Sequence, residues 1–250
     1  MKKKVLLLGA SGNIGTGFIE NYLENQEYQK DYDLIIGIHQ HNSITDKLKT
    51  RKFSLTDLDS LRKAFQGIDV IINLAANPHP EADFENLIDS NLIGAYNVFQ
   101  IAKEKKVARV IFASSVHAIK GYDLDYKVRA EDAPKPLTIY GATKAFGEAL
   151  CYTFSQNSEL SCIAIRIGAY AAKEKMHNVC SQRTDYHYFV SQKDLSQLIH
   201  KTIIAPEKIK YTILAGISNN KKHSMDLELA KKLVNYNPKD DAYAICEKTR

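Results

Sequence analysis

Short apolar runs alternate with longer amphipathic segments along this 250-residue chain. The runs are rich in Val, Ile, Leu and Ala at consecutive positions, which is typical of parallel strands that are buried on both faces. We expect strands at Val5–Leu8, Leu34–Ile38, Val70–Asn73, Val110–Ala113, Ser161–Ile165 and Tyr211–Leu214.

Between these runs, apolar residues recur every three or four positions, which is the spacing of an amphipathic helix. We expect helices at Asn13–Leu23, Leu58–Phe65, Asn91–Lys105, Tyr140–Phe154, Asp194–Ile204 and Asp226–Val234. The alternation of strands and helices predicts an α/β fold, a Rossmann-type doubly wound parallel sheet with helices on both faces. We expect one domain over residues 1–250, with a cofactor-binding part at about 1–165 and a small C-terminal lid at about 168–250.

Composition and charge exclude several classes of protein. The 34 basic and 29 acidic residues are interspersed, so the net charge of +5 does not predict a nucleic-acid surface. No apolar stretch approaches the ~20 residues that a membrane helix needs. The four cysteines show no Cys-x-x-Cys spacing, which favours a reduced cytoplasmic protein, and we predict no metal site.

A glycine-rich turn follows the first apolar run. Gly9, Gly12 and Gly15 have the spacing at which a backbone turn can approach a pyrophosphate and point helix amides at its charge. A tight strand-to-helix turn without a ligand is the alternative interpretation, and the flanking strand and helix favour the cofactor. The expected cofactor loop consists of Gly9, Ser11, Gly12, Asn13, Ile14 and Gly15.

The end of the second predicted strand leaves the choice of cofactor open. An acidic residue usually holds the ribose 2′-hydroxyl of NAD here, and an arginine accommodates the 2′-phosphate of NADP. No acid lies between Asp33 and Asp46, and no Arg or Lys lies between Lys30 and Lys47. We expect His39 or Gln40 to contact the ribose.

Tyr140 and Lys144 are four residues apart, which is one helical turn, and therefore share a face. A phenol titrates near pH ~10, and a nearby ammonium lowers that pKa. Ser114 or Ser115, at the end of the strand before them, could supply a hydroxyl that orients a substrate. Each residue alone fits a surface or capping role, but together with the glycine loop they predict proton transfer beside a nucleotide.

The chain resembles the extended short-chain dehydrogenases/reductases, the NAD-dependent epimerase/dehydratase family. Five runs carry the resemblance besides the glycine loop: Leu74-Ala75-Ala76, Asn91-Leu92-Ile93-Gly94, Phe112-Ala113-Ser114-Ser115, Tyr140-x-x-x-Lys144 and Arg166-Ile167-Gly168.

This resemblance assigns roles to particular residues. It implies Ser115 as the catalytic serine, Tyr140 as the base, and Lys144 as its partner and a ligand of the cofactor ribose. It also implies that residues 74–76 line the nicotinamide side and that Asn91 lies near the active site. NAD is the implied cofactor, with NADP not excluded, and a homodimer through the helices at 91–105 and 140–154 is implied as well.

Two longer runs are similar to uronate dehydrogenases, namely Ser114-Ser115-Val116-His117 and the segment from Tyr140 to Glu148. The similarity implies a small sugar, sugar acid or polyol as substrate. Its contacts would come from Asn77, Ser115, His117, Tyr140, Asn178 and Arg183.

The chain also departs from that group. Val116 stands where those enzymes have asparagine, Ala169 and Pro78 stand where they have serine, and Asn178 stands where they have the arginine that pairs with the carboxylate. The catalytic residues are therefore kept while the carboxylate-binding groups are largely lost.

These observations predict an NAD(P)-dependent oxidoreductase of a small carbohydrate. Two alternatives remain open: a sugar epimerase with tightly bound NAD, and a non-catalytic dinucleotide-sensing protein.

Overall fold

The computed structural model describes residues 2–39, 45–172, 179–180 and 183–247. Within these residues, seven strands form one parallel sheet, and they are β1 (Lys3–Leu8), β2 (Tyr32–Ile38), β3 (Lys49–Lys52), β4 (Val70–Asn73), β5 (Arg109–Ser115), β6 (Ser161–Ile167) and β9 (Tyr211–Gly216). The strand order is β3-β2-β1-β4-β5-β6-β9. Every pairing is parallel, as the continuous apolar runs predict.

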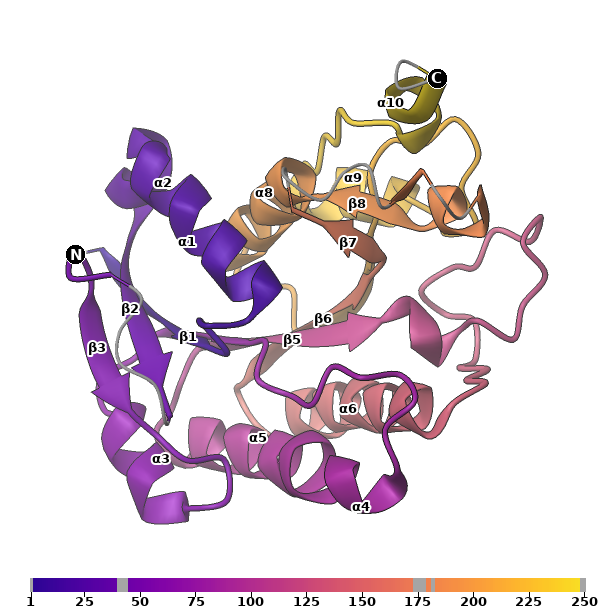
Figure 1. Ribbon diagram of the computed structural model, residues 1–250. Coiled ribbons are helices and arrows are strands. Elements are labelled where there is room, and N and C mark those ends of the chain that lie inside the picture. The colour runs from indigo at the N-terminus through magenta and orange to yellow at the C-terminus, as the bar shows by residue number, and fades with distance from the viewer. Residues whose placement is uncertain (1, 40–44, 173–178, 181–182, 248–250) are drawn as a thin grey trace.

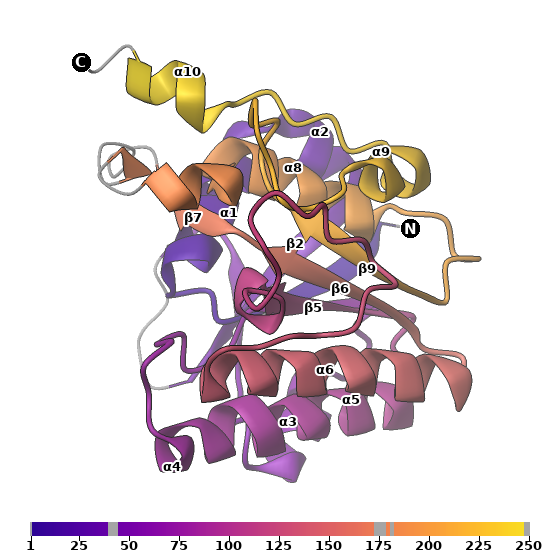
Figure 2. The same ribbon diagram turned by 90° about the vertical axis from the view of Figure 1, so that its right-hand side faces the viewer.

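Helices cover both faces of the sheet (Figures 1 and 2). One face carries α1 (Asn13–Glu24), α2 (Gln26–Asp31), α8 (Gln192–Ile203) and α9 (Glu228–Val234). The other carries α3 (Leu58–Ala64), α4 (Phe84–Leu87), the π-helical η1 (Ile88–Ile93), α5 (Gly94–Glu104) and α6 (Ile139–Gln156). This arrangement confirms the Rossmann-type fold, and each predicted strand and helix is present with end shifts of a few residues.

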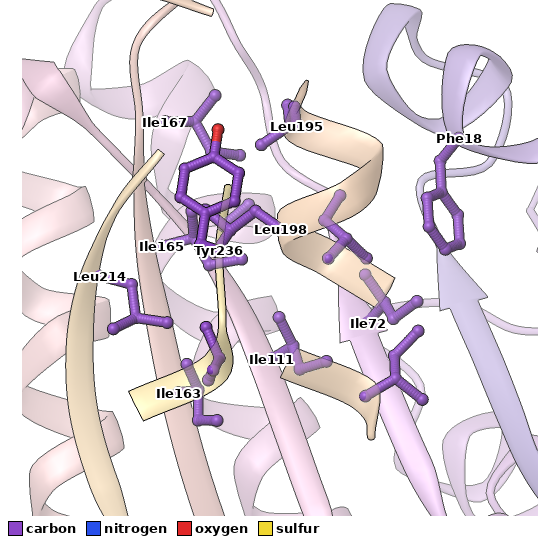
Figure 3. Packing of buried hydrophobic residues seen from close by; sticks show 14 of the residues in the cluster. Phe18, Ile72, Ile111, Ile163, Ile165, Ile167, Leu195, Leu198, Leu214 and Tyr236 are labelled. Carbon is purple, nitrogen blue, oxygen red and sulfur yellow. The ribbon is translucent and has the colours of Figure 1, made fainter. Parts of the chain in front are cut away.

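Alternate residues along each strand pack into separate cores. Ile72, Ile111 and Ile163 contribute to the cluster below α1 and α8, where Phe18, Leu195 and Leu198 are also buried (Figure 3). Their sequence neighbours Ile71, Val110 and Cys162 pack on the opposite face against α5 and α6. Burial on both faces fixes the strand register, and with it the place where each strand ends.

Strand β3 and the start of the helix expected at Asn91 differ from the sequence prediction. Strand β3 reads Lys49-Thr50-Arg51-Lys52 and is mostly exposed at the sheet edge, where charged residues discourage further strand pairing. The helix expected to begin at Asn91 instead continues from α4 through η1 into α5, so helical structure already begins at Phe84.

A second, two-stranded sheet follows the main one. It pairs β7 (Ala169–Ala171) with β8 (Phe189–Ser191), and the short helix η4 (Arg183–His187) precedes β8. The last helix, α10 (Ala242–Glu247), packs on this region through the cluster that contains Val179, Tyr186 and Phe189. We refer to β7 and β8 as the small sheet.

The cysteines differ from the expectation of a fully reduced protein. Cys180 and Cys246 form a disulfide, while Cys151 and Cys162 are buried thiols. The pairing joins residues 66 positions apart and depends on α10 folding back, so cysteine spacing could not reveal it. Within the described residues, no helix has the length and apolar character required to cross a membrane.

Candidate active site

The sheet order reverses beside β1, because β2 and β4 flank it and their connections run in opposite directions. Open α/β sheets bind ligands at such a point, outside the carboxyl ends of the strands. A cavity of about 890 Å³ lies here. Its lining includes most of the residues predicted for the site: Gly9, Ser11, Gly12, Asn13, Ile14, Gly15, His39, Leu74, Ala75, Ala76, Asn77, Ser115, His117, Tyr140 and Lys144.

The glycine loop forms one end of the cavity. Gly9 has φ of 81°, and a Cβ there would lie 2.7 Å from the backbone nitrogen of Ala75, so only glycine fits between β1 and the chain after β4. Gly12 caps α1 without a side-chain hydrogen bond, and the first turn of α1 contains no acid. The helix amides and dipole are therefore available to a phosphate, and the loop fits a dinucleotide.

The residues that the sequence predicts to be catalytic meet at the other end. Ser115 is the last residue of β5, and α6 begins beside it with Thr138 as its N-cap, accepting a hydrogen bond from the Gly141 amide. Tyr140 and Lys144 lie on the first two turns of α6 and face the same cavity. The Lys144 Nζ lies 5.5 Å from the centre of the Tyr140 ring.

Burial dominates the electrostatics of this pair. It raises the pKa of Tyr140, and a hydrogen bond with Ser115 opposes that rise. It lowers the pKa of Lys144 to about 8. The sequence predicts that Lys144 lowers the pKa of Tyr140, but in the structure the Nζ donates to the Ala113 carbonyl at 2.9 Å and burial has the larger effect on the phenol.

His117 closes the substrate side of the site. Its ring packs edge-on against Tyr140 with ring centres 5.5 Å apart, and its backbone amide donates to the Ser115 Oγ. Burial lowers the pKa of His117 to about 4, and the nearby charge of Lys120 acts in the same direction. The imidazole is therefore neutral at pH 7 and offers a hydrogen bond rather than a positive charge.

Asn91 does not line the cavity but lies behind its wall. Its Oδ1 accepts a hydrogen bond from the Asn77 amide at 2.8 Å, and its Nδ2 donates to the Asn77 carbonyl and to the Thr143 Oγ1. Asn91 thus connects the chain after β4 with α6 and positions Asn77. Of the remaining predicted contacts, Gln40 and Asn178 lie outside the described residues, and only the backbone of Arg183, at the start of η4, is described.

A buried ion pair below the site was not predicted. The Arg166 Nε and Nη2 each donate to the Glu148 carboxylate at 2.9 Å, and the Ser114 Oγ donates to the same carboxylate at 2.6 Å. Both charged side chains are almost fully buried. The sequence contains both residues within runs already noted, but nothing in it connects positions 148 and 166.

Tyr170 of β7 is a further lining residue that sequence analysis missed. It comes two residues after the Arg166-Ile167-Gly168 run, in a segment whose irregular pattern predicts no element.

Two relatives are similar to the chain over nearly its whole length. L-arabinose 1-dehydrogenase (NAD(P)(+)) of Haloferax volcanii is 27% identical, covering 98% of this chain and 99% of its own length. Uronate dehydrogenase of Pseudomonas putida is also 27% identical, covering 96% of this chain and 85% of its own.

Among solved structures, a mutant uronate dehydrogenase from Agrobacterium tumefaciens complexed with NAD superposes with a TM-score of 0.83 at 23% identity, covering all of this chain and 91% of its own. The sequence model of the NAD dependent epimerase/dehydratase family matches residues 5–188. That match includes the glycine loop, Ser115, Tyr140 and Lys144, and the chain belongs to this family.

Proposed function

We propose that this protein oxidises a hydroxyl group of a small sugar, sugar acid or polyol with NAD(P) as the acceptor. One observation carries the proposal: Ser115, Tyr140 and Lys144 meet at one end of a single cavity whose other end is the glycine loop. The dehydrogenases of sugars and uronates among the relatives support it.

The chain's own residues would remove the proton of the substrate hydroxyl group. When bound, NAD supplies an acceptor for the hydride that leaves the carbon bearing the hydroxyl group. Tyr140 as the phenolate takes the hydroxyl proton, and Ser115 donates a hydrogen bond that orients the reacting oxygen. Lys144, with its pKa lowered to about 8, is still mostly protonated at pH 7 and stabilises the phenolate.

The charges of the described lining residues favour a neutral sugar over a uronate. Among the described lining residues, Lys144 is the only lysine or arginine, and its Nζ already donates to the Ala113 carbonyl. His117 is neutral at pH 7, and Asp89 adds a carboxylate to the wall. We therefore propose a neutral aldose, the substrate class named for the arabinose dehydrogenase, rather than a uronate.

The test is reduction of NAD and NADP by the purified protein with a panel of neutral and acidic sugars. We expect turnover with a neutral aldose, and a fall in kcat of about 10²-fold or more in Tyr140→Phe. Tyr152→Phe, an exposed tyrosine on the same helix, should keep wild-type turnover. Undiminished turnover in Tyr140→Phe contradicts the proposal.

Two other results would support the alternatives. NAD that stays bound through dialysis, with no net NADH from any sugar, would indicate the epimerase. NAD binding without turnover across the panel would indicate the dinucleotide-sensing protein.

A homodimer and a cytoplasmic location also remain proposals. Apolar side chains between 38% and 54% exposed lie along α4, η1, α5 and α6, and they are Phe84, Ile93, Tyr96, Ile139, Phe146 and Tyr152. A second copy that packs on this face would bury them, and light scattering should then report twice the chain mass of 28.2 kDa.

The Cys180–Cys246 disulfide weighs against a strongly reducing compartment as the location of the folded protein.

A further inference from the structure

One tyrosine of the small sheet contacts the first turn of α1. The Tyr170 hydroxyl donates to the Asn13 carbonyl at 3.3 Å, although the two residues are 157 positions apart. Both Figures 1 and 2 show β7 beside α1. Asn13 belongs to the glycine loop and is the first residue of α1, and both Asn13 and Tyr170 line the 890 Å³ cavity. The contact therefore joins the two sides of the cavity at its glycine-loop end.

Gly17 provides the space for this contact. A Cβ at residue 17 would lie 2.3 Å from the Tyr170 hydroxyl and 2.9 Å from the Cδ of Gln192. Gly17 is buried inside α1, where alanine has the higher helix propensity, so the glycine reflects close approach rather than helix stability. The absence of a side chain at residue 17 lets the Tyr170 hydroxyl approach α1 closely.

Gln192 makes a second bond between the same parts. Its Nε2 donates to the Gly17 carbonyl at 3.3 Å and to the Glu20 carboxylate at 2.9 Å. Gln192 is the first residue of α8 and follows β8 directly. Hydrogen bonds therefore connect α1 with β7 through Tyr170 and with the end of β8 through Gln192.

We propose that Tyr170 is a positioning residue that retains the dinucleotide by holding the small sheet against the first turn of α1. The choice of a dinucleotide as the ligand rests on the proposed function, while the contact itself does not. Loss of the contact should free the small sheet from the glycine loop and speed the release of the cofactor.

The experiment measures NAD and NADH binding directly, by calorimetry and by the fluorescence of NADH, so it needs no turnover. Tyr170→Phe removes the hydrogen bond to the Asn13 carbonyl, and we expect the NAD dissociation constant to rise about threefold to tenfold, mainly through a faster off-rate. The KM of the sugar should change less than the KM of NAD. Tyr126→Phe also loses one phenol hydrogen bond but lies outside the cavity lining, and it should bind NAD as the wild type does.

Gly17→Ala tests the same contact from the other side. The added Cβ displaces the Tyr170 hydroxyl, so this variant should weaken NAD binding to a similar extent. In the Tyr170→Phe/Gly17→Ala double variant the two effects should be less than additive, because the hydroxyl that clashes is gone. Wild-type unfolding midpoints in the variants would show that each one still folds.

The outcomes separate the two proposals. If the wild type binds NAD while Tyr170→Phe and Gly17→Ala keep its dissociation constant and off-rate within twofold, this inference is wrong and the proposed function stands. If the wild type binds no dinucleotide, both are wrong.

Discussion

Lys144 and Glu148 are successive buried charges on the same face of α6, one helical turn apart, but their hydrogen-bond and ion-pair partners differ. Glu148 is 3% exposed and shares its carboxylate with Arg166 and Ser114 at hydrogen-bond distance. Lys144 is 5% exposed, and within the described part of the chain it has a carbonyl as its acceptor and no ion-pair partner.

This difference separates a charge that stabilises the fold, Glu148, from a charge that can take part in the reaction, Lys144. A buried carboxylate with a bidentate arginine and a hydroxyl has its bonding capacity satisfied, so it holds β5, β6 and α6 together. A buried ammonium without a counter-ion is destabilised in its charged form, which lowers its pKa to about 8 and makes it responsive near neutral pH. Of these two charges, the one without a counter-ion lines the cavity and the ion-paired one lies below it.

The largest effect is expected from Glu148→Gln. The isosteric amide leaves the Arg166 charge buried and unpaired, and breaking a buried pair costs about 3–5 kcal/mol of unfolding free energy. Urea denaturation measures this loss. Glu159→Gln, which removes an exposed partner of Lys210, is the matched control and should change stability little. Equal losses of unfolding free energy in Glu148→Gln and Glu159→Gln would contradict the structural role of the buried ion pair.

Lys144→Met should act in the opposite direction. Burial lowers the Lys144 pKa from 10.5 to about 8, a cost on the order of 3 kcal/mol at neutral pH. Losing the hydrogen bond to Ala113 offsets about 1 kcal/mol, so we expect a gain of about 2 kcal/mol together with lost turnover. Lys103→Met, an exposed lysine on α5, should give neither result.

The lowered pKa of Lys144 also predicts a pH dependence of stability with a definite sign. Between pH 8 and 10.5 the unfolded chain holds a proton on Lys144 that the folded chain has released. Stability of the wild type should therefore rise across this window relative to Lys144→Met. Parallel stability curves for the two proteins would show that Lys144 titrates normally.

The smallest effect on stability is expected at the neighbouring serines. Ser114→Ala removes one bond from a carboxylate that Arg166 still holds, so we expect a loss of about 1 kcal/mol with turnover kept. Ser115→Ala removes the acceptor of the His117 amide, so we expect a similar loss of about 1 kcal/mol and, in addition, a fall in kcat of about 10²-fold. Unfolding curves and steady-state kinetics on both variants test whether structure and chemistry divide between adjacent residues.

Most of the fold could be predicted because both faces of the sheet are apolar, and continuous runs such as those of β1 and β5 mark buried strands. Strand β3 was missed because an exposed edge needs no apolar residues. In the site, the glycine loop and the pair on α6 were visible because local spacing carries their chemistry. Contacts such as Glu148 with Arg166, or Tyr170 with Asn13, arise only when the chain folds, and no local pattern encodes them.

The disulfide has a consequence for how damage to this protein would be detected. Cys180 and Cys246 close a covalent ring of chain that contains β8, α8, β9 and α9. Lys221 and Lys222 lie within that ring and are exposed. A protease cut after either lysine would leave two fragments that migrate as one band in electrophoresis until a reductant separates them.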